Sequence, residues 1–296
     1  KSINIIQNFF SIDLLYLNCS MKQLKTPLRY PGGKSRAVKK LFGYYPYNKS
    51  DYKEFREPFL GGGSFALEWT KRFPDTKVWV NDLYEPLANF WMELQHDGEA
   101  LQNSVWKIKN LHPDRDTARE LFEQAKEDIN NKGLTNRERA AAFYVTNKCS
   151  FSGLTESSSF SPQASESNFS YRGIEKLAEY GKLIQHWKIT NSTYTDLLTD
   201  DPTVFIYSDP PYEISSNLYG RKGAMHKKFD HDQFASDCDD ACADHIISYN
   251  SSQLIRDRFV NWNASEFDHT YTMRSVGKYM LEQMDRKELV LTNYTV

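Results

Sequence analysis

Cysteine is scarce in this chain, and its spacing does not indicate disulfide staples. The four cysteines, Cys19, Cys149, Cys238 and Cys242, are scattered through 296 residues, so the chain should fold on its own apolar core in a reducing compartment, with the cytoplasm as default. Cys238 and Cys242 with His245 are one possible set of metal ligands. No second Cys/His pair completes it, and residues four apart more often simply share a helix face, so no metal is predicted.

An overall excess of basic charge is also absent, because the formal net charge is −2. Any nucleic-acid surface must therefore be local. Two basic runs exist: residues 21–50 carry lysine and arginine without an acidic residue, and a later run interleaves aromatic residues with Arg221, Lys222, Lys227 and Lys228. Each run is either a solvated face or a phosphate-binding segment.

No hydrophobic run is long enough to span a membrane. The apolar stretch at residues 3–17 is interrupted by Asn8 and Asp13, and it lacks the basic cluster of a signal sequence. We expect no membrane association and a natural start at Met21. Residues 1–20 are then an extension outside the core, with an extra surface helix as the alternative.

A phosphate-binding loop is excluded by one missing glycine. Residues 29–36, RYPGGKSR, end in Gly-Lys-Ser, but a nucleotide hydrolase loop needs glycine five positions before that element, where this chain has Leu28. Tyr30 and Pro31 also prevent the backbone from wrapping phosphates, so this segment serves another purpose.

The order of apolar segments predicts a doubly wound α/β sheet. A strand at 53–60 runs into three glycines, a helix capped by Ser64 follows to Arg72, and a second strand ends at Asn81-Asp82. Residues 87–144 are helical in pattern, and 150–170 are polar, as a loop or a binding surface would be. Strands return at 187–190, 204–208, 245–249, 266–273 and 288–294, which makes the helical middle an insertion into one sheet domain.

The turn Phe59-Leu60-Gly61-Gly62-Gly63 is the better candidate for a cofactor loop. Gly61 and Gly63 permit close approach of a ligand, and Asp82, about twenty residues on, is placed to accept both ribose hydroxyls of a nucleoside. The pattern fits a dinucleotide or S-adenosylmethionine, and a plain strand-to-helix bend remains the alternative.

The buried-strand run at 204–208 ends in Asp209-Pro210-Pro211-Tyr212. Two prolines make the turn rigid, so the Asp209 carboxylate and the Pro210 carbonyl can accept both N–H groups of an aromatic amine and aim its lone pair at a methyl donor. Tyr212 would stack on the base. An adenine inside a duplex would have to be flipped out to reach this turn.

Four motifs in order, RYPGGK, EPFLGGGS, VNDLYEPL and SDPPY, resemble the Dam-type (alpha-group) S-adenosylmethionine-dependent DNA adenine-N6 methyltransferases. The resemblance runs from Leu28 to Tyr294. It implies a Rossmann-like methyltransferase sheet from residues 21–87 and 186–296, with an inserted, mainly helical target-recognition domain at 88–185. It also implies that Tyr30 and Lys34 line the methionine half of the cofactor, that Gly61 and Gly63 form its floor, and that Asp82 holds the ribose. Phe59 belongs to the same cofactor site, and Asp209 lies between the methyl donor and the target amine.

The resemblance implies a DNA-facing surface at Asn147, Lys148 and Ser152. The basic run at 221–228 directly follows the proline turn, so it could clamp phosphates beside the flipped base. GATC-specific relatives place an arginine where this chain has Thr155 and Glu156, which puts GATC recognition in doubt. The sequence thus predicts a site-specific, double-stranded DNA adenine methyltransferase without an obligate protein partner, a monomer or weak dimer, acting in the cytoplasm at the nucleoid. A catalytically silent DNA-binding regulator and an RNA adenine methyltransferase remain alternatives.

Overall fold

The computed structural model describes residues 25–296 except 31, 48, 50–51, 154–155, 157, 213–228 and 269–286. The expectations for residues 1–20, Met21, Thr155 and the run at 221–228 (Arg221, Lys222, Lys227 and Lys228) therefore lie outside the described residues.

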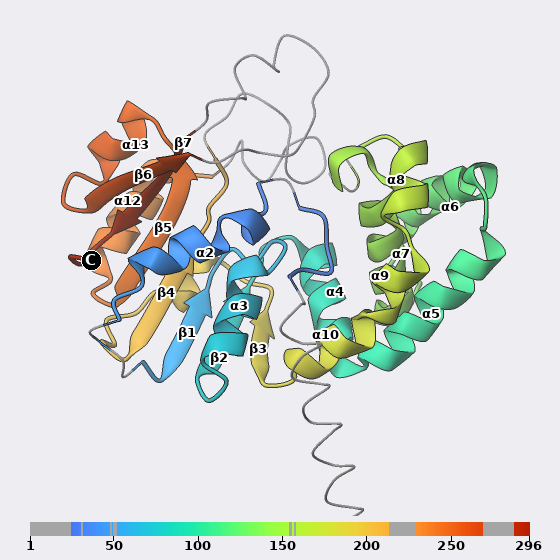
Figure 1. The fold of residues 1–296 in the computed structure, drawn as a ribbon, viewed down its shortest axis with the longest axis horizontal. Coiled ribbons are helices and arrows are strands. Elements are labelled where there is room, and N and C mark those ends of the chain that lie inside the picture. Colours follow the sequence, from blue (N-terminus) through green and yellow to red (C-terminus); the bar gives the residue numbers. More distant parts are fainter. Residues whose placement is uncertain are drawn as a thin grey trace, which may run out of the picture.

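Seven strands form one sheet in the order β3-β2-β1-β4-β5-β7-β6 (Figure 1). The first five strands of that order run parallel, and β7 is antiparallel to both β5 and β6. This arrangement confirms the predicted Rossmann-like α/β class. The strands are β1 Glu54–Glu57, β2 Lys77–Asn81, β3 Trp187–Thr190, β4 Val204–Ser208, β5 Asp244–Asn250, β6 Asn263–Asp268 and β7 Lys287–Thr292. β6 starts three residues before the predicted strand at 266–273, whose last five residues lie outside the described part.

Helices cover both faces of the sheet. Successive side chains of β5 and β7 point to opposite faces, and the apolar ones on each face are buried. Ile246 and Val290 join the core shared with the first helices, while Ile247 and Leu289 pack on the opposite face with Phe234. The covering elements are η1 Lys34–Arg36, α2 Val38–Leu41, η2 Phe42–Tyr44, α3 Ser64–Arg72, η5 Tyr194–Leu197, α12 His231–Asp240 and α13 Gln253–Arg258.

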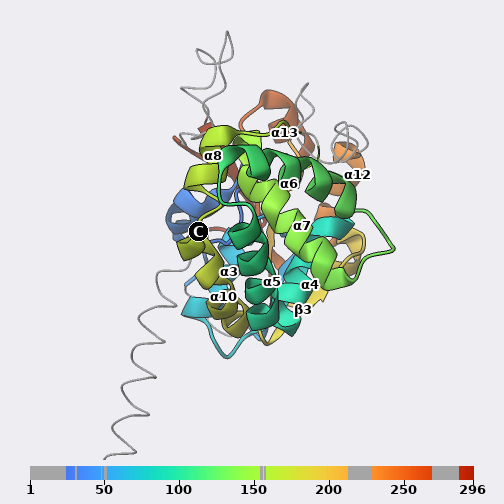
Figure 2. The same cartoon turned by 90° about the vertical axis from the view of Figure 1, so that its right-hand side faces the viewer.

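A group of helices stands between β2 and β3 in the chain and lies beside the sheet (Figures 1 and 2). It starts at Glu85 and ends at Leu183, close to the predicted insertion at 88–185. The elements are α4 Glu85–His96, α5 Gly98–Leu111, α6 Arg115–Asp128, α7 Asn136–Cys149, η3 Phe151–Gly153, α8 Pro162–Ser167, α9 Tyr171–Glu175 and α10 Leu177–Leu183. Among the described residues, no helix combines the length and the apolar character that crossing a bilayer requires.

Candidate active site

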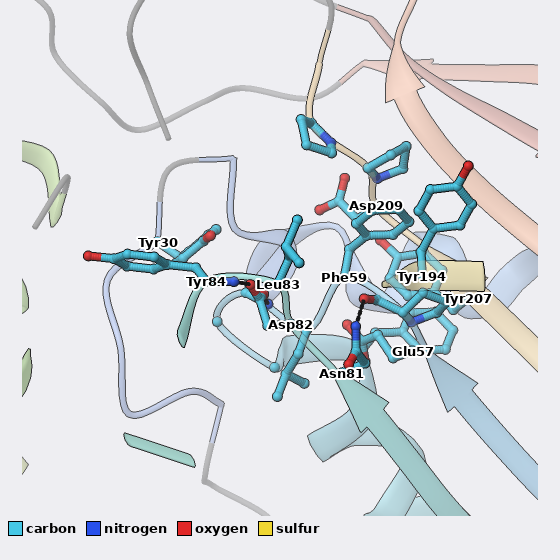
Figure 3. A pocket seen from close by; sticks show the side chains of 18 of the residues that line it. Tyr30, Glu57, Phe59, Asn81, Asp82, Leu83, Tyr84, Tyr194, Tyr207 and Asp209 are labelled. Carbon is cyan, nitrogen blue, oxygen red and sulfur yellow. Dashed lines mark hydrogen bonds between the residues drawn. The ribbon is translucent and has the colours of Figure 1, made fainter. Parts of the chain in front are cut away.

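A cavity of about 530 Å³ opens where β1, β2 and β4 end. Parallel strands of a doubly wound sheet present their carboxyl ends at one edge, which is where such folds bind ligands. Figure 3 shows side chains from separate segments converging on it. Nine residues predicted from sequence line this cavity: Tyr30, Lys34, Phe59, Gly61, Gly63, Asp82, Asp209, Pro210 and Pro211.

The floor of the cavity is the glycine turn between β1 and α3. Gly61 and Gly63 have φ of 50° and 65°, in the left-handed region that favours glycine. The Gly61 carbonyl accepts a hydrogen bond from Trp91 Nε1 at 3.1 Å. A Cβ on Gly63 would lie 2.8 Å from Cζ2 of the same Trp91, so the turn packs against α4 with no room for a side chain.

Gly63→Ala is expected to lower the free energy of unfolding by about 2–4 kcal/mol, because left-handed strain and overpacking against Trp91 add. Urea unfolding measures this loss. Gly43→Ala is the matched control, since Gly43 has ordinary φ and a Cβ added there would meet no atom within 4 Å. Equal stability of the two variants would contradict the packing described for this turn.

The prediction that Ser64 caps helix α3 is wrong. The N-cap residue is Gly63, so no side chain at the cap accepts a hydrogen bond from the first turn of the helix. Instead, Glu57 Oε2 at the end of β1 accepts a hydrogen bond from Ala66 N at 2.8 Å. The sequence had shown Glu57 only as part of a strand. Burial, and then the nearby carboxylates of Asp209 and Asp82, raise the pKa of Glu57 well above its ordinary value.

Asp82 joins the glycine turn to the start of α4. Its Oδ2 accepts from Gly61 N and its Oδ1 from Tyr84 N, both at 2.9 Å. Burial raises the pKa of Asp82 to about 6, while these two backbone N–H groups lower it. Each carboxylate oxygen has a second lone pair. The side chain therefore retains acceptor capacity on the cavity side.

Asp209 follows directly after β4, and its carboxylate is held from two directions. Lys34 Nζ lies 2.7 Å from Oδ1 and 2.8 Å from Oδ2, and Ser248 Oγ donates to Oδ1 at 3.2 Å. The Asp209 side chain is 23% exposed, whereas the Lys34 side chain is 3% exposed. Burial raises the pKa of Asp209; Lys34 acts against this rise, and the charge of Glu288 adds to it. The site thus contains an oriented carboxylate at the cavity wall.

Tyr212 is expected to stack on the base, but its ring lies buried outside the cavity wall. It is 7% exposed and does not belong to the cavity wall formed by Asp209, Pro210 and Pro211. Its hydroxyl accepts from Lys34 Nζ at 2.6 Å and donates to Glu288 Oε1 at 2.8 Å. Stacking on a base would require the ring to leave these buried contacts.

Three aromatic side chains, Phe59, Tyr194 and Phe229, form an aromatic wall of the cavity. Phe59 and Tyr194 stack with ring centroids 5.6 Å apart, and Phe229 meets Phe59 edge-on at 5.7 Å. Tyr194 is fixed by a 2.6 Å hydrogen bond from its hydroxyl to Asp237. The sequence reasoning missed Tyr194, because it lies in a short polar connection after β3 with no motif around it. This wall gives a planar ligand an apolar surface.

Asn147 is not on an exposed surface, which corrects its predicted place facing DNA. The side chain is fully buried: Oδ1 accepts from Arg29 N at 2.9 Å, and Nδ2 donates to Arg29 O at 2.6 Å. Arg29 in turn donates from Nη1 to Ser150 O at 2.9 Å. These bonds tie the segment before Tyr30 to the end of α7, so the role of Asn147 is to position that segment.

Asn147→Ala is expected to cost about 2–3 kcal/mol of unfolding free energy, because it leaves the Arg29 peptide groups without buried partners. Thermal and urea unfolding without DNA measure this cost. Asn263→Ala is the control, an exposed asparagine on β6 whose amide donates to a single backbone carbonyl. A variant that loses only DNA affinity at full stability would restore the original prediction.

Two other residues expected to face DNA, Lys148 and Ser152, are among the described residues. Lys148 is half-buried over the Tyr144 ring, and burial followed by the charge of Arg29 lowers its pKa to about 8. Ser152 lies in η3. Glu156 accepts hydrogen bonds from Tyr84 Oη and Asn130 Nδ2, which links the segment after α7 to the cavity wall.

The alternative of a cysteine–histidine metal site gains no support from the positions of its residues. Cys238 is buried on α12, Cys242 is exposed, and His245 Nε2 is hydrogen-bonded to Ser208 Oγ at 2.8 Å. Within the described ranges, no three histidine, cysteine or acidic side chains converge as a metal site would need.

A Rossmann-like sheet whose cavity joins a glycine turn to an Asp-Pro-Pro-Tyr strand end is the arrangement expected of an amino-group methyltransferase. A family model described as D12 class N6 adenine-specific DNA methyltransferase matches residues 30–273. The chain belongs to this family, and its activity is the methylation of adenine in DNA. It is also similar to the Type II methyltransferase M.MjaIII of Methanocaldococcus jannaschii, with 24% identity over 203 residues that cover 64% of this chain and 70% of the relative.

Proposed function

We propose that the cavity binds S-adenosylmethionine and that the chain is a Dam-type member of its family, acting on an adenine flipped out of double-stranded DNA. The lining suits this cofactor: an aromatic wall for the purine, a carboxylate at Asp82 for the ribose, and a narrow floor at Gly61 and Gly63. Tyr30 and Lys34 also line the cavity, and we place the methionine half beside them. When bound, the cofactor supplies an electrophilic methyl group.

The protein's part of the reaction is to prepare the amine. The Asp209 carboxylate and the Pro210 carbonyl accept the two N–H groups of adenine N6, which draws the nitrogen lone pair out of ring conjugation. Lys34 and Ser248 hold the carboxylate in one orientation. After methyl transfer the nitrogen must lose one proton, and Asp209, whose pKa burial has raised, is the carboxylate beside it.

The helices between β2 and β3 are proposed as the target-recognition domain, with boundaries at 88 and 185. Lys148 and Ser152 would meet DNA from this side, and the basic run at 221–228 would contact phosphates beside the flipped base. We propose a target other than GATC. Glu156 supports this, because a carboxylate cannot donate to guanine as arginine does, and this one is already held by Tyr84 and Asn130.

We also propose that the chain works as a monomer or weak dimer, on DNA of the cytoplasmic nucleoid. It is either part of a restriction–modification system, as the name of its archaeal relative suggests, or a solitary methylase. Long-read modification mapping of DNA from cells that express the chain would give its sequence context. Methylation confined to GATC would contradict the proposed target.

The observation that carries the proposed reaction is that Asp209 opens into the same cavity as the glycine turn and Asp82. Incubation of the purified chain with methyl-labelled S-adenosylmethionine and unmodified duplex DNA, single-stranded DNA or RNA tests it. We expect label in duplex DNA. Label in RNA alone would favour the RNA methyltransferase alternative, and DNA binding without label would favour the silent regulator.

A further inference from the structure

Glu288 is a buried acidic residue that the reaction described above leaves without a role. It lies on β7 and is 0% exposed. Burying an ionised carboxylate costs several kcal/mol unless charge and hydrogen-bond partners compensate it. The groups that interact with the Glu288 carboxylate therefore indicate its role.

Two partners of Glu288 belong to the active-site cluster. Oε1 accepts from the Tyr212 hydroxyl at 2.8 Å and lies 3.2 Å from Lys34 Nζ. Lys34 is the same cation that holds Asp209 at 2.7 Å. Two carboxylates thus flank one ammonium group, with Asp209 on the cavity side and Glu288 on the buried side.

The hydrogen bonds within this cluster have a direction. The three N–H groups of an ammonium match three acceptors here, which are the Asp209 carboxylate, the Tyr212 hydroxyl and, at 3.1 Å, the Gly32 carbonyl. Tyr212 accepts from Lys34 because its own proton goes to Glu288. Glu288 consequently fixes the orientation of the hydroxyl, and through it the position of the ammonium group that orients Asp209.

We propose that Glu288 is a positioning residue for methyl transfer: through Tyr212 and Lys34 it sets the orientation and the charge of Asp209. This inference rests on the proposed role of Asp209. Among the described residues, the groups that interact with Asp209 by charge or hydrogen bond include Lys34 from η1, Glu57 from β1, Tyr207 from β4, Ser248 from β5 and Glu288 from β7. Among them, Glu288 is the carboxylate paired with the cation that holds Asp209.

Glu288→Gln keeps the shape of the side chain and removes its charge. We expect kcat to fall by about 10- to 10²-fold, as for a misplaced catalytic group, with the KM values for DNA and cofactor within about 3-fold of wild type. The acidic limb of the kcat–pH profile should move to lower pH, since loss of a like charge lowers the pKa of Asp209. A Glu288 that only stabilised the fold would not move this limb.

Two further variants separate charge from folding. Glu288→Asp retains the charge and is expected to restore the acidic limb with part of kcat. Glu266→Gln is the matched control, because it removes a carboxylate on the neighbouring strand β6 that pairs with Arg256 away from the cavity. It should leave kcat and the pH profile unchanged. A Glu288→Gln enzyme with wild-type kcat and pH profile would overturn the proposal.

A direct titration tests the proposal without activity. In protein labelled with ¹³C at aspartate carboxyls, with the Asp209 signal assigned through Asp209→Asn, the Asp209 pKa should be lower in Glu288→Gln than in wild type. An equal pKa would overturn the role of Glu288. Absence of methyl transfer by the wild type would instead refute the proposed function, so the two failures are distinguishable. If Glu288→Gln does not fold, Tyr212→Phe removes the bridging hydroxyl, and unchanged kcat in that variant would also overturn the proposal.

Discussion

Asp209→Ala is expected to lower kcat for methyl transfer by about 10²- to 10³-fold, with little change in the affinity for DNA. The carboxylate is the charged acceptor that draws the amine lone pair toward the methyl donor, and removal of one such group typically costs two to three orders of magnitude. Single-turnover transfer of labelled methyl measures the loss.

The fold should tolerate this change. Without Asp209, Lys34 keeps Glu288 as its counter-ion at 3.2 Å, and one of two neighbouring carboxylates has been removed. We therefore expect an unfolding free energy within about 1 kcal/mol of wild type or above it. Asp75→Ala, at an exposed aspartate before β2, should leave both activity and stability unchanged. Transfer at the wild-type rate by Asp209→Ala would contradict the assignment.

Lys34→Met, unlike Asp209→Ala, is expected to destabilise the fold. We expect a loss of about 3–5 kcal/mol in unfolding free energy as well as a large loss of kcat. The substitution leaves the Asp209 and Glu288 carboxylates close together without their shared cation. Since Lys34 lowers the pKa of Asp209, its removal raises that pKa further. Urea unfolding and single-turnover transfer measure the two losses.

The stability deficit of Lys34→Met should depend on pH with a definite sign. A carboxyl group whose pKa is raised in the folded state binds more protons there than in the unfolded chain, so stability rises as pH falls through the folded pKa. The deficit should therefore be largest at alkaline pH and shrink toward acid. Lys39→Met, at an exposed lysine of α2, is the control. A deficit independent of pH would show that Lys34 acts by packing and not by charge.

Sequence patterns predicted the fold and the cavity because both depend on local signals. The apolar runs at 187–190 and 204–208 coincide with β3 and β4, and the glycine turn and the proline turn both follow strands. In a parallel sheet these strand ends must meet at one edge. Gly61, Asp82 and Asp209 could thus be assigned to one site without knowledge of any contact.

The partners of these residues could not be predicted in the same way, because they come from distant segments. Asn147 carries the family pattern, yet its amide is used by the backbone of Arg29, 118 positions earlier. Lys34 was placed beside the cofactor, and its closest contacts join it to Asp209 and Tyr212. Glu288 stands at the start of an apolar run, where an acidic residue usually marks an exposed strand end. Its burial depends on a lysine from the other end of the chain.

The identity of the methylated base decides whether the chain is an adenine-N6 methyltransferase that acts through Asp209. Duplex DNA treated with the purified chain and methyl-labelled S-adenosylmethionine would be digested to nucleosides and separated by mass. We expect the label in N6-methyldeoxyadenosine, with at least about 100-fold less of it formed by Asp209→Ala. Label in a methylated cytosine, or equal N6-methyldeoxyadenosine from wild type and Asp209→Ala, would contradict this expectation.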